Sequence, residues 1–498
     1  MTRNHASLET VDTEGQPLLR TFDTSEAADF IHALTGVGDE EELERNLLKK
    51  LDRRMSILVL IYILNYIDRN NTPAARLLGF EEDLHLEGTQ FASILSILYI
   101  GYILMQVPSN MFLNYIGKPS VYLPSCMIIW GGLSVCTGFT RDYFGALCIR
   151  FFLGFVEAAF FPGALFLLAK WYKQSELSQR TALLASGILL SNAFGSLIAS
   201  AILNNMEGFL GFRAWRWLFF VEGTITIFVA IWAMFVLPDF PENSSNWLTP
   251  AEQALAMKRM HQDTRRDHIQ HNEFLDDLSE QCLGRWPGLH LAVADWKVWW
   301  LAVTLLCIVI SLSFNVYFPT LSATLGYGPI ITLLLCAPPW LFATVVALSL
   351  SRHSDRVGER SKHIALSLFI GTFGFVLSVS TMNTGIRYFS LFLMAQSYGA
   401  FICFLAWASG SVSYPPAKRA VALALINCIS QLGNVIGSYV WPLSWGPTYN
   451  NSYYICILMS ALSITMCLVF RLHLASLNHR IDGLEAEQGR GKGYRYML

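Results

Sequence analysis

Long apolar runs separated by polar segments dominate the sequence. Twelve runs reach the length of about 20 residues that a helix needs to cross roughly 30 Å of hydrocarbon. They are 55–73, 90–113, 121–139, 143–169, 181–203, 215–237, 298–320, 329–350, 364–382, 387–411, 420–445 and 452–474. Lipid offers backbone N–H and C=O groups no partner, so each run should be helical. The runs lack the alternating polarity of membrane β-barrel strands. The pattern therefore predicts an all-α polytopic membrane protein with twelve transmembrane helices.

The polar segments divide these runs into two groups of six. We predict a disordered N-terminal tail (1–50), a first six-helix half (51–238), a linker (239–295), a second six-helix half (296–474) and a C-terminal tail (475–498). Lys and Arg gather before the first run, after the fourth, eighth and tenth runs, and in the linker. Because these residues mark the cytoplasmic side, both tails and the linker are expected in the cytosol.

Weak internal repetition relates the two halves. Asn114-Tyr115-Ile116-Gly117-Lys118 follows the second run, and Asp355-Arg356-Val357-Gly358-Glu359-Arg360 follows the eighth. Two parallel six-helix halves are the layout of transporters that work by alternating access. In such proteins the substrate site lies between the halves, near the middle of the membrane.

Composition excludes several other functions. Only 14% of the 498 residues are charged, against about 25% in soluble domains, and the net charge of −2 gives no reason to expect a nucleic-acid partner. Nine of the ten cysteines lie in apolar runs and Cys282 in a polar loop, so neither a disulfide framework nor a metal site is indicated. HExxH, GxSxG and glycine-rich phosphate motifs are missing from the sequence, so we expect neither an enzyme nor a cofactor.

Four ionisable residues stand out inside the runs, where a charge costs at least about 2.5–3.5 kcal/mol. Asp68 and Arg69 belong to the first run, and Arg150 and Glu157 to the fourth. The latter two are seven residues apart, so they project from one helix face, about 10 Å apart along its axis, and each can reach a partner on the first run.

This combination favours an anion and proton site. A guanidinium suits a carboxylate, and a buried carboxyl group can hold a proton. We therefore predict that Asp68 and Glu157 couple protons and that Arg69 and Arg150 bind substrate. Two other interpretations stay open: a static ion-pair cluster, or a position for Asp68 and Arg69 at the wetted outer end of their run.

Neutral polar residues inside the runs are candidates for hydrogen bonds to a ligand. They are Tyr99, Asn192, Asn315 and Asn427. Hydrogen bonds between helices explain each of them equally well. Glu222, in the sixth run, is more ambiguous. It follows Trp215-Arg216-Trp217, and a structural ion pair with Arg216 would account for it.

The order of several short motifs over about 50–475 resembles the major facilitator superfamily. More narrowly, the chain is similar to the anion:cation symporter family and its fungal allantoate permease branch. The motifs are Asn65-Tyr66-Ile67-Asp68-Arg69-Asn70-Asn71, Tyr99 to Asn110, Arg150 to Gly163, Trp171-Tyr172, Trp215 to Phe219, Tyr317 to Thr320, Ser354-Asp355-Arg356, Lys418-Arg419-Ala420 and Trp441-Pro442. The chain departs from the pattern at Asn114, where the superfamily loop has an acid, at Ala169, and at Gly195-Ser196.

The resemblance implies a major facilitator fold and proton-coupled symport of a small organic anion, such as a vitamin, an allantoate-like compound or another nutrient acid. By the family pattern, Asp68 and Glu157 exchange protons while Arg69 and Arg150 bind or gate the anion. Asp355 and Arg356 belong to a loop motif that latches one conformation by charge pairing.

Two other functions fit the same fold. They are efflux of a secondary metabolite or drug, and nutrient sensing by a receptor that does not transport. We expect a monomer in the lipid bilayer whose partners are protons and the anion. The plasma membrane is the expected location. The acidic dileucine pattern from Glu14 to Leu19 indicates the vacuolar membrane as the alternative.

Overall fold

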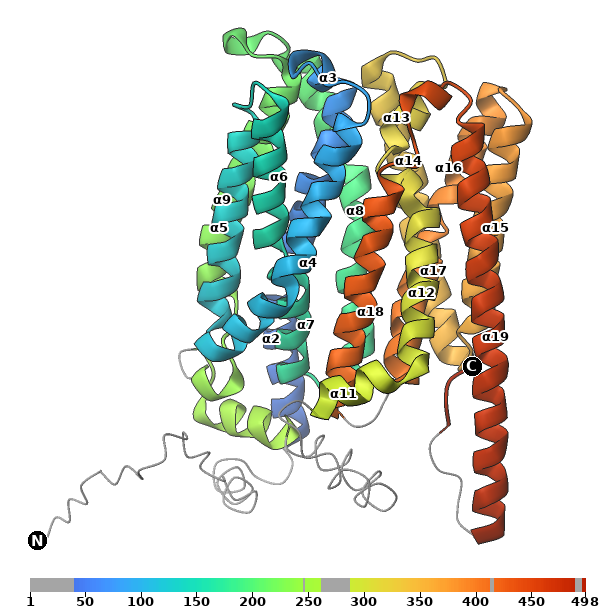
Figure 1. Cartoon of the computed structure of the whole chain (residues 1–498). Helices are drawn as coiled ribbons and strands as arrows, with labels where there is room; N and C mark the ends of the chain where they lie inside the picture. Colours follow the sequence, from blue (N-terminus) through green and yellow to red (C-terminus); the bar gives the residue numbers. More distant parts are fainter. Residues whose placement is uncertain (1–39, 245–246, 261–286, 413–415, 489–494) are drawn as a thin grey trace, which may run out of the picture.

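The structure is a computed structural model that describes residues 40–244, 247–260, 287–412, 416–488 and 495–498 (Figure 1). These residues form helices and connecting segments, with no strand among them. The dileucine pattern and Cys282 lie outside the described residues, as do most of the predicted N-terminal tail and part of the linker.

The first half of the chain forms one helical bundle, here called the N-terminal half. Its helices are α2 (Glu40–Arg76), α3 (Phe80–Asp83), α4 (Gln90–Ile116), α5 (Pro119–Thr137), α6 (Tyr143–Glu157), α7 (Phe160–Trp171), α8 (Gln174–Met206), η1 (Phe209–Gly211) and α9 (Ala214–Val236). The linker contributes η2 (Pro241–Asn243) and a helix over 250–260. As the Thr249 and Glu252 positions suggest, each side chain bonds to the other's backbone N–H and so caps that helix.

A second bundle, the C-terminal half, follows the linker. Its helices are α11 (Pro287–Ala294), α12 (Trp296–Ser311), η3 (Leu312–Asn315), α13 (Phe318–Ala323), α14 (Pro329–Val357), α15 (Ser361–Ser380), α16 (Thr384–Ala395), α17 (Tyr398–Ser411), α18 (Pro416–Gly437), η4 (Leu443–Trp445) and α19 (Asn450–Gln488). We call the end of the molecule that holds α11 and the start of α2 the linker end, and the opposite end the α3 end (Figure 1).

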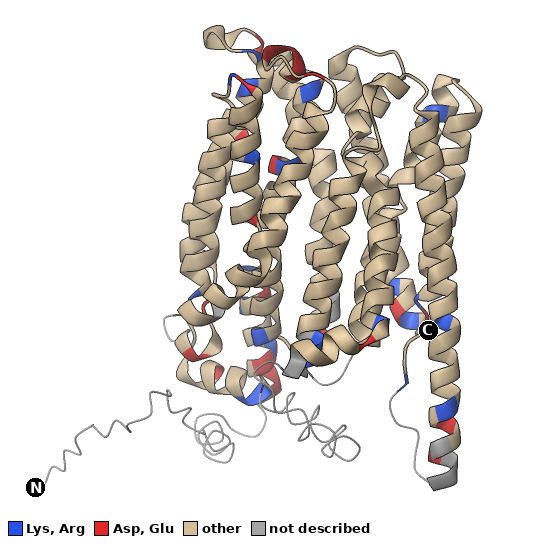
Figure 2. Cartoon of the chain, viewed as in Figure 1, with Lys and Arg blue, Asp and Glu red and all other residues tan. Residues whose placement is uncertain are grey.

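The described helices correspond to the twelve predicted runs. Ten are long and apolar enough to cross a membrane, and the apolar part of α18, Val421–Gly437, is a shorter one. The remaining run lies in α2, whose apolar character is diluted by the same polar residues, such as Asp68 and Arg69, that suggested a functional site. Figure 2 shows that charged residues are sparse along the middle of the bundle and gather at its ends.

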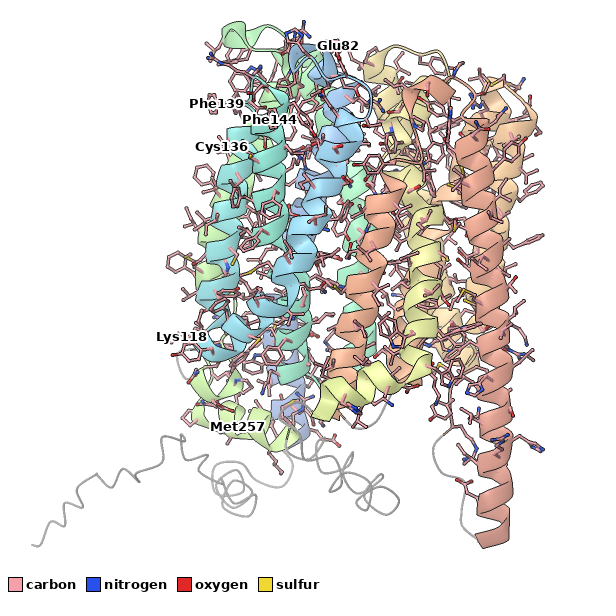
Figure 3. The ribbon with its side chains drawn as sticks, viewed as in Figure 1. Glu82, Lys118, Cys136, Phe139, Phe144 and Met257 are labelled. Carbon is pink, nitrogen blue, oxygen red and sulfur yellow. The ribbon has the colours of Figure 1, made fainter. Side chains whose placement is uncertain are left out.

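The sides of the bundle expose large apolar side chains, as a surface in contact with lipid requires. Phe139 and Phe144 are 60% and 70% exposed and project from the flank of the N-terminal half (Figure 3). Such a belt would be an aggregation hazard in water and is stable in hydrocarbon.

Three of the runs are interrupted helices. The fourth run breaks between Glu157 and Phe160, separating α6 from α7. Pro162 explains this break, because it cannot donate to the carbonyl of Ala158 and its ring crowds that turn. The seventh run breaks through η3, and the tenth breaks at Gln396 and Ser397, between α16 and α17. The break in the fourth run therefore leaves Glu157 at a helix end in the middle of the bundle.

The two halves touch mainly along two pairs of helices, α8 with α14 and α4 with α18, and to a smaller extent where α2 meets α13 and α8 meets α17. Hydrogen bonds join them near the α3 end. The hydroxyl of Tyr439 lies 3.1 Å from Ser93 Oγ and 3.3 Å from Ser96 Oγ, and Ser200 Oγ donates to the carbonyl of Ile330 at 3.1 Å. The halves are therefore held together at the α3 end in this state.

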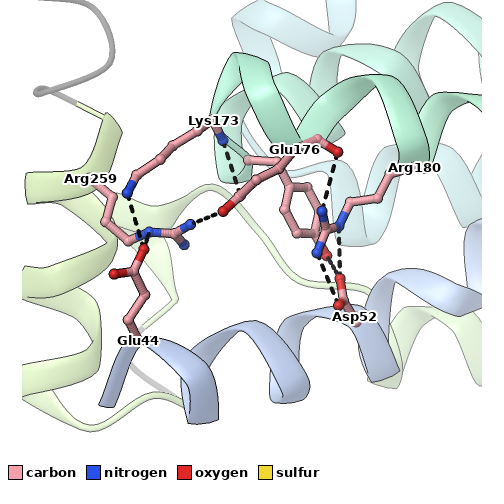
Figure 4. A network of polar contacts seen from close by, with 7 residues as sticks. Glu44, Asp52, Lys173, Glu176, Arg180 and Arg259 are labelled. Carbon is pink, nitrogen blue, oxygen red and sulfur yellow. Dashed lines mark hydrogen bonds and ion pairs between the residues drawn. The ribbon is translucent and has the colours of Figure 1, made fainter. Parts of the chain in front are cut away.

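A network that we call the linker clamp holds the 250–260 helix against the N-terminal half at the linker end (Figure 4). Arg259 contacts Glu44 and Glu176, both at 2.7 Å, and Lys173 contacts Glu44 at 3.0 Å. Burial by itself would raise the pKa of Glu44. The hydrogen bond from Lys173 and the charge of Arg259 outweigh it, so that pKa lies below its usual value.

The C-terminal half is held at the same end by the last described residues. The carbonyl oxygen of Leu498 accepts from the backbone N–H of Arg360 and Ser361, at the start of α15. The carbonyl of Met497 accepts from the indole of Trp407 at 2.9 Å. The oxygen of Leu498 thereby satisfies donors that the first turn of α15 leaves without partners.

Candidate functional site

The polar residues of α2 point in different directions, because neighbouring residues in a helix are rotated by about 100°. Asp68 faces α5 and α9. Its two carboxyl oxygens accept from Ser134 Oγ at 3.0 Å and Thr226 Oγ1 at 3.2 Å. The residue is 1% exposed, which excludes a position in water at the outer end of the run. Asp68 therefore lies inside the N-terminal half, held by two hydroxyl groups.

Arg69 faces α4 and α6 instead. Its Nε atom lies 2.5 Å from Glu157 Oε2, and the two side chains are 8% and 0% exposed. The guanidinium also lies over the rings of Tyr66 and Tyr102, with its carbon 5.1 Å and 4.8 Å from their centroids. Glu157 Oε1 has no hydrogen-bond partner. The pair that the spacing predicted between the first and fourth runs is thus Arg69 with Glu157, and half of the carboxyl group is unsatisfied.

Two glycines bring α4 into backbone contact with α6, the helix that carries Glu157. A Cβ atom on Gly154 would lie 1.9 Å from the carbonyl oxygen of Leu98, and one on Gly101 would lie 2.3 Å from that of Phe151. No other residue fits at either place without moving a helix. Tyr102 follows Gly101 directly, so the same contact brings its ring up to Arg69.

Arg150 is buried on the same helix face as Glu157, as the seven-residue spacing predicted, and is 2% exposed. Its guanidinium carbon lies 5.8 Å from the centroid of Phe219, and its Nε and Nη2 atoms have no hydrogen-bond partner. Arg150 therefore acts on the nearby charges of Asp68 and Glu157 through the field, without an ion pair among the described residues.

A narrow cavity between the halves opens onto Arg69. Tyr62, Asn65, Tyr66, Arg69, Tyr102, Phe161, Ala185 and Ile188 line it from the N-terminal half, and Phe401, Leu405, Asn427 and Gln431 from the C-terminal half. Arg69 is the one charged residue in this lining. A cavity with a single guanidinium and several aromatic and amide groups suits an anion with an apolar or hydrogen-bonding body.

The predicted ligand residues fall into different places. Asn427 lines the cavity at Arg69, but Asn192 and Asn315 line a second cavity nearer the α3 end. In that second cavity Asn192 Oδ1 accepts from Asn70 at 2.7 Å, while Asn315 Oδ1 has no partner. Tyr99 packs against the core of the N-terminal half and lines neither cavity.

Sequence reasoning did not assign several residues of the Arg69 cavity. Tyr66 and Asn65 precede Arg69 by three and four residues, and Gln431 follows Asn427 by four, so helical spacing was a usable signal for all three. Phe401 reaches the cavity from α17, and no pattern in the sequence indicated it.

The suggested structural pair between Glu222 and Arg216 is wrong. Arg216 donates from Nη1 to the carbonyls of Gly138 and Thr140, at 2.9 Å each, and its Nη2 lies 3.7 Å from Asp83. These partners are at the α3 end, whereas Glu222 turns into the bundle. There it is 2% exposed, and neither of its carboxyl oxygens has a hydrogen-bond partner.

Comparison with known proteins agrees with this architecture. Residues 58–438 match the family model of the Major Facilitator Superfamily. The chain is 30% identical over 465 residues to the "MFS-type transporter cnsO" of Penicillium expansum, covering 88% of this chain and 87% of that protein. The chain belongs to the major facilitator superfamily. It is also 28% identical over 401 residues to a "Putative tartrate transporter" of Agrobacterium vitis, covering 80% of this chain and 84% of that protein.

Solved structures of superfamily transporters share the fold. The partially occluded inward-open conformation of the xylose transporter XylE from E. coli superposes with a TM-score of 0.61 at 17% identity. The superposition covers 84% of this chain and 98% of XylE. The present protein is accordingly a membrane transporter with the twelve-helix major facilitator fold.

The predicted gating residues of this superfamily member lie at the linker end, in the last turn of α14. Asp355 pairs with Arg360, with Oδ1 2.6 Å from Nη2. Arg356, predicted as its gating companion, is exposed. Asp355 at the end of α14 is therefore paired with Arg360, an arginine that sequence reasoning did not assign. Both residues of this ion pair belong to the C-terminal half.

Proposed function

We propose that the protein is a proton-coupled transporter that carries a small organic anion by alternating access. One observation supports this proposal above the others. Arg69, the one charged residue lining the cavity between the halves, is paired with a buried carboxyl group that has an unsatisfied oxygen. A guanidinium in this position can exchange an internal carboxylate for an external one.

The exchange would link anion binding to proton binding. An incoming carboxylate that takes the guanidinium of Arg69 leaves Glu157 without its partner. A buried carboxylate without a partner costs several kcal/mol, so Glu157 would take up a proton. By reciprocity, a proton on Glu157 frees Arg69 and strengthens anion binding. The anion and the proton then occupy the site together, and the cluster keeps its net charge while the halves rock about it.

A carboxylate is the anion that we propose, in line with the resemblance to the anion:cation symporter family and its allantoate permease branch. The relative named as a putative tartrate transporter supports this class. The aromatic and amide lining beside Arg69 supports a compact substrate with hydrogen-bonding groups.

Uptake into proteoliposomes tests the function directly. The substrates are labelled carboxylates, including tartrate, and the neutral amide of each one transported, measured with and without an inward proton gradient. We expect accumulation of an acid, driven by external acidity, and no accumulation of its amide. Equal transport of acid and amide would refute the anion site. Accumulation that ignores the proton gradient would refute proton coupling.

The remaining expectations are part of the same proposal. We propose a monomer in the plasma membrane, because one chain lines the whole cavity at Arg69, with both tails and the linker in the cytosol. Protease added to intact cells should spare tags at either end and in the linker. Cleavage of a linker tag from outside would reverse the orientation.

A further inference from the structure

Glu222 on α9 is a buried carboxyl group to which the exchange at Arg69 gives no role. It is 2% exposed, and neither oxygen accepts a hydrogen bond. The amide of Asn71 lies near it, but Asn71 Nδ2 makes no hydrogen bond. Burial without a hydrogen bond or an ion pair disfavours the ionised carboxylate.

Neither α5 nor α8 offers Glu222 a cation. Residues 119–137 of α5 and 181–206 of α8 contain no Lys, Arg, His, Asp or Glu, and Tyr122 is the one tyrosine in the two ranges. From α2 the one charged group that acts on Glu222 is Asp68, which has the same sign. On α9 itself the residue one turn on is Thr226, which donates to Asp68. Glu222 thus lies near Asp68. Arg150 approaches α9 one turn earlier, at Phe219, and no ion pair joins it to Glu222 among the described residues.

Close packing keeps water away from this position. A Cβ atom on Gly223 would lie 2.8 Å from the carbonyl oxygen of Gly131, and one on Gly131 would lie 3.0 Å from that of Gly223. The backbones of α5 and α9 therefore touch directly beside Glu222. Hydration cannot replace the missing partner.

The net charge of the buried cluster also indicates that one of its carboxyl groups holds a proton. The middle of the N-terminal half holds two arginines, Arg69 and Arg150, and three carboxyl groups, Asp68, Glu157 and Glu222. With every group ionised the cluster carries one negative charge in excess, and one bound proton makes it neutral. Because two neighbouring carboxyl groups in low dielectric do not both ionise, that proton belongs to Asp68 and Glu222 jointly.

We propose that Glu222 is a proton-binding residue paired with Asp68, so that the two hold one proton between them before an anion arrives. When Asp68 takes up a second proton from the transport path, it loses the negative charge that held the proton on Glu222, and that proton becomes easier to release. The inference deepens the proposed proton coupling and relies on it for its use in transport.

Infrared difference spectroscopy of the purified full chain in lipid nanodiscs, titrated from about pH 5 to about pH 9, tests this site without transport. We expect a protonated carboxyl band that persists at neutral pH and is lost in Glu222→Gln. Asp68→Asn keeps Glu222 but removes the neighbouring negative charge, so the band should disappear at a lower pH than in wild type. The proton concentration at that point should be at least about tenfold higher. Glu87→Gln, at an exposed carboxyl group, is the matched control and should leave the band unchanged.

Each outcome bears on the pair. A band that survives Glu222→Gln, or that titrates identically in Asp68→Asn and wild type, would overturn the proposal. If Glu222→Gln does not fold, Glu222→Asp retains the carboxyl group and should move the band without removing it. Absence of proton-driven uptake in the wild type would refute the proposed function but not this proton site. A band that does not belong to Glu222 would refute only the site.

Discussion

The two halves share one architecture and differ in what they place at its interrupted helices. In the N-terminal half the fourth run breaks at Glu157, an acid with one ion-pair partner and one unsatisfied oxygen. In the C-terminal half the tenth run breaks at Gln396, which donates to the carbonyls of Ser367 and Leu393 at 2.9 and 3.0 Å and accepts from Ser367 Oγ at 3.2 Å. The side-chain oxygen and nitrogen of Gln396 both have hydrogen-bond partners, whereas one carboxyl oxygen of Glu157 has none.

The same contrast extends through the two interiors. The buried side-chain atoms without partners in the described part of the C-terminal half belong to Asn, Thr, Ser and His residues, whereas those in the N-terminal half include Arg150, Glu157 and Glu222. A buried unsatisfied charge is expensive, so its persistence indicates a use. We therefore expect the N-terminal half to carry the proposed ion chemistry, while the C-terminal half supplies the opposite wall of the cavity.

The largest expected effect follows from removing the cation of the cavity. Arg69→Ala strands Glu157 and removes the anion partner, which should cost about 3–5 kcal/mol and lower carboxylate uptake by at least about a hundredfold. Arg387→Ala is the control in the C-terminal half, because Arg387 donates to the neutral Thr324 Oγ1 and to the carbonyl of Thr448. It should lower the thermal midpoint but keep the preference for acid over amide. If both variants lose that preference equally, the contrast between the halves fails.

The second effect separates coupling from structure at the two breaks. Glu157→Gln imitates the protonated acid, so it should abolish accumulation driven by a proton gradient, more than about tenfold, while exchange of substrate across the membrane continues. Gln396→Leu removes hydrogen bonds from the matching break and should lower stability by about 1–3 kcal/mol with coupling intact. Accumulation that persists in Glu157→Gln would show that another group couples the proton.

A smaller effect tests the backbone contact that aligns the charged helices. Gly154→Ala inserts a methyl group where the carbonyl of Leu98 stands 1.9 Å away, so α4 and α6 must separate. We expect a loss of about 1–3 kcal/mol, read as a lower thermal midpoint, together with weaker uptake. The control is Gly132→Ala on α5, where a Cβ atom meets nothing within 4 Å. Equal stability of the two variants would mean that this contact does not fix the position of Glu157.

The smallest effect concerns the hydroxyl groups around Asp68. Ser134→Ala removes a hydrogen bond donated to a carboxylate, worth about 1 kcal/mol, and so favours the protonated form. The pH at which uptake is half-maximal should therefore rise by about 0.7 of a unit. Ser411→Ala, whose hydroxyl donates to a backbone carbonyl in the C-terminal half, should leave the pH profile unchanged. If the pH of half-maximal uptake is lower or unchanged in Ser134→Ala, Asp68 does not titrate during transport.

Much of the fold could be predicted because lipid restricts the choice of structure. The length of the apolar runs gave twelve helices, the seven-residue spacing put Arg150 and Glu157 on one face, and the cost of intramembrane charge marked the site on α2 and α6. Each of these inferences depends on local geometry or on burial of a single helix. None of the three inferences requires knowing which helices are neighbours in the bundle.

Only the tertiary structure decided how the marked residues are partnered. Asp68 and Arg69 are adjacent in the chain, yet one faces α5 and α9 and the other faces the cavity. Glu222 could not be separated from Arg216 by spacing, because its environment is set by α2 and α5, far away in sequence. For the same reason, the sequence could not show that Asn427 lines one cavity while Asn192 and Asn315 line the other. Hydrophobic periodicity shows which residues are buried, but the pairing of charges depends on the rotation and contact of separate helices, which glycines such as Gly101 and Gly154 permit only once the bundle is assembled.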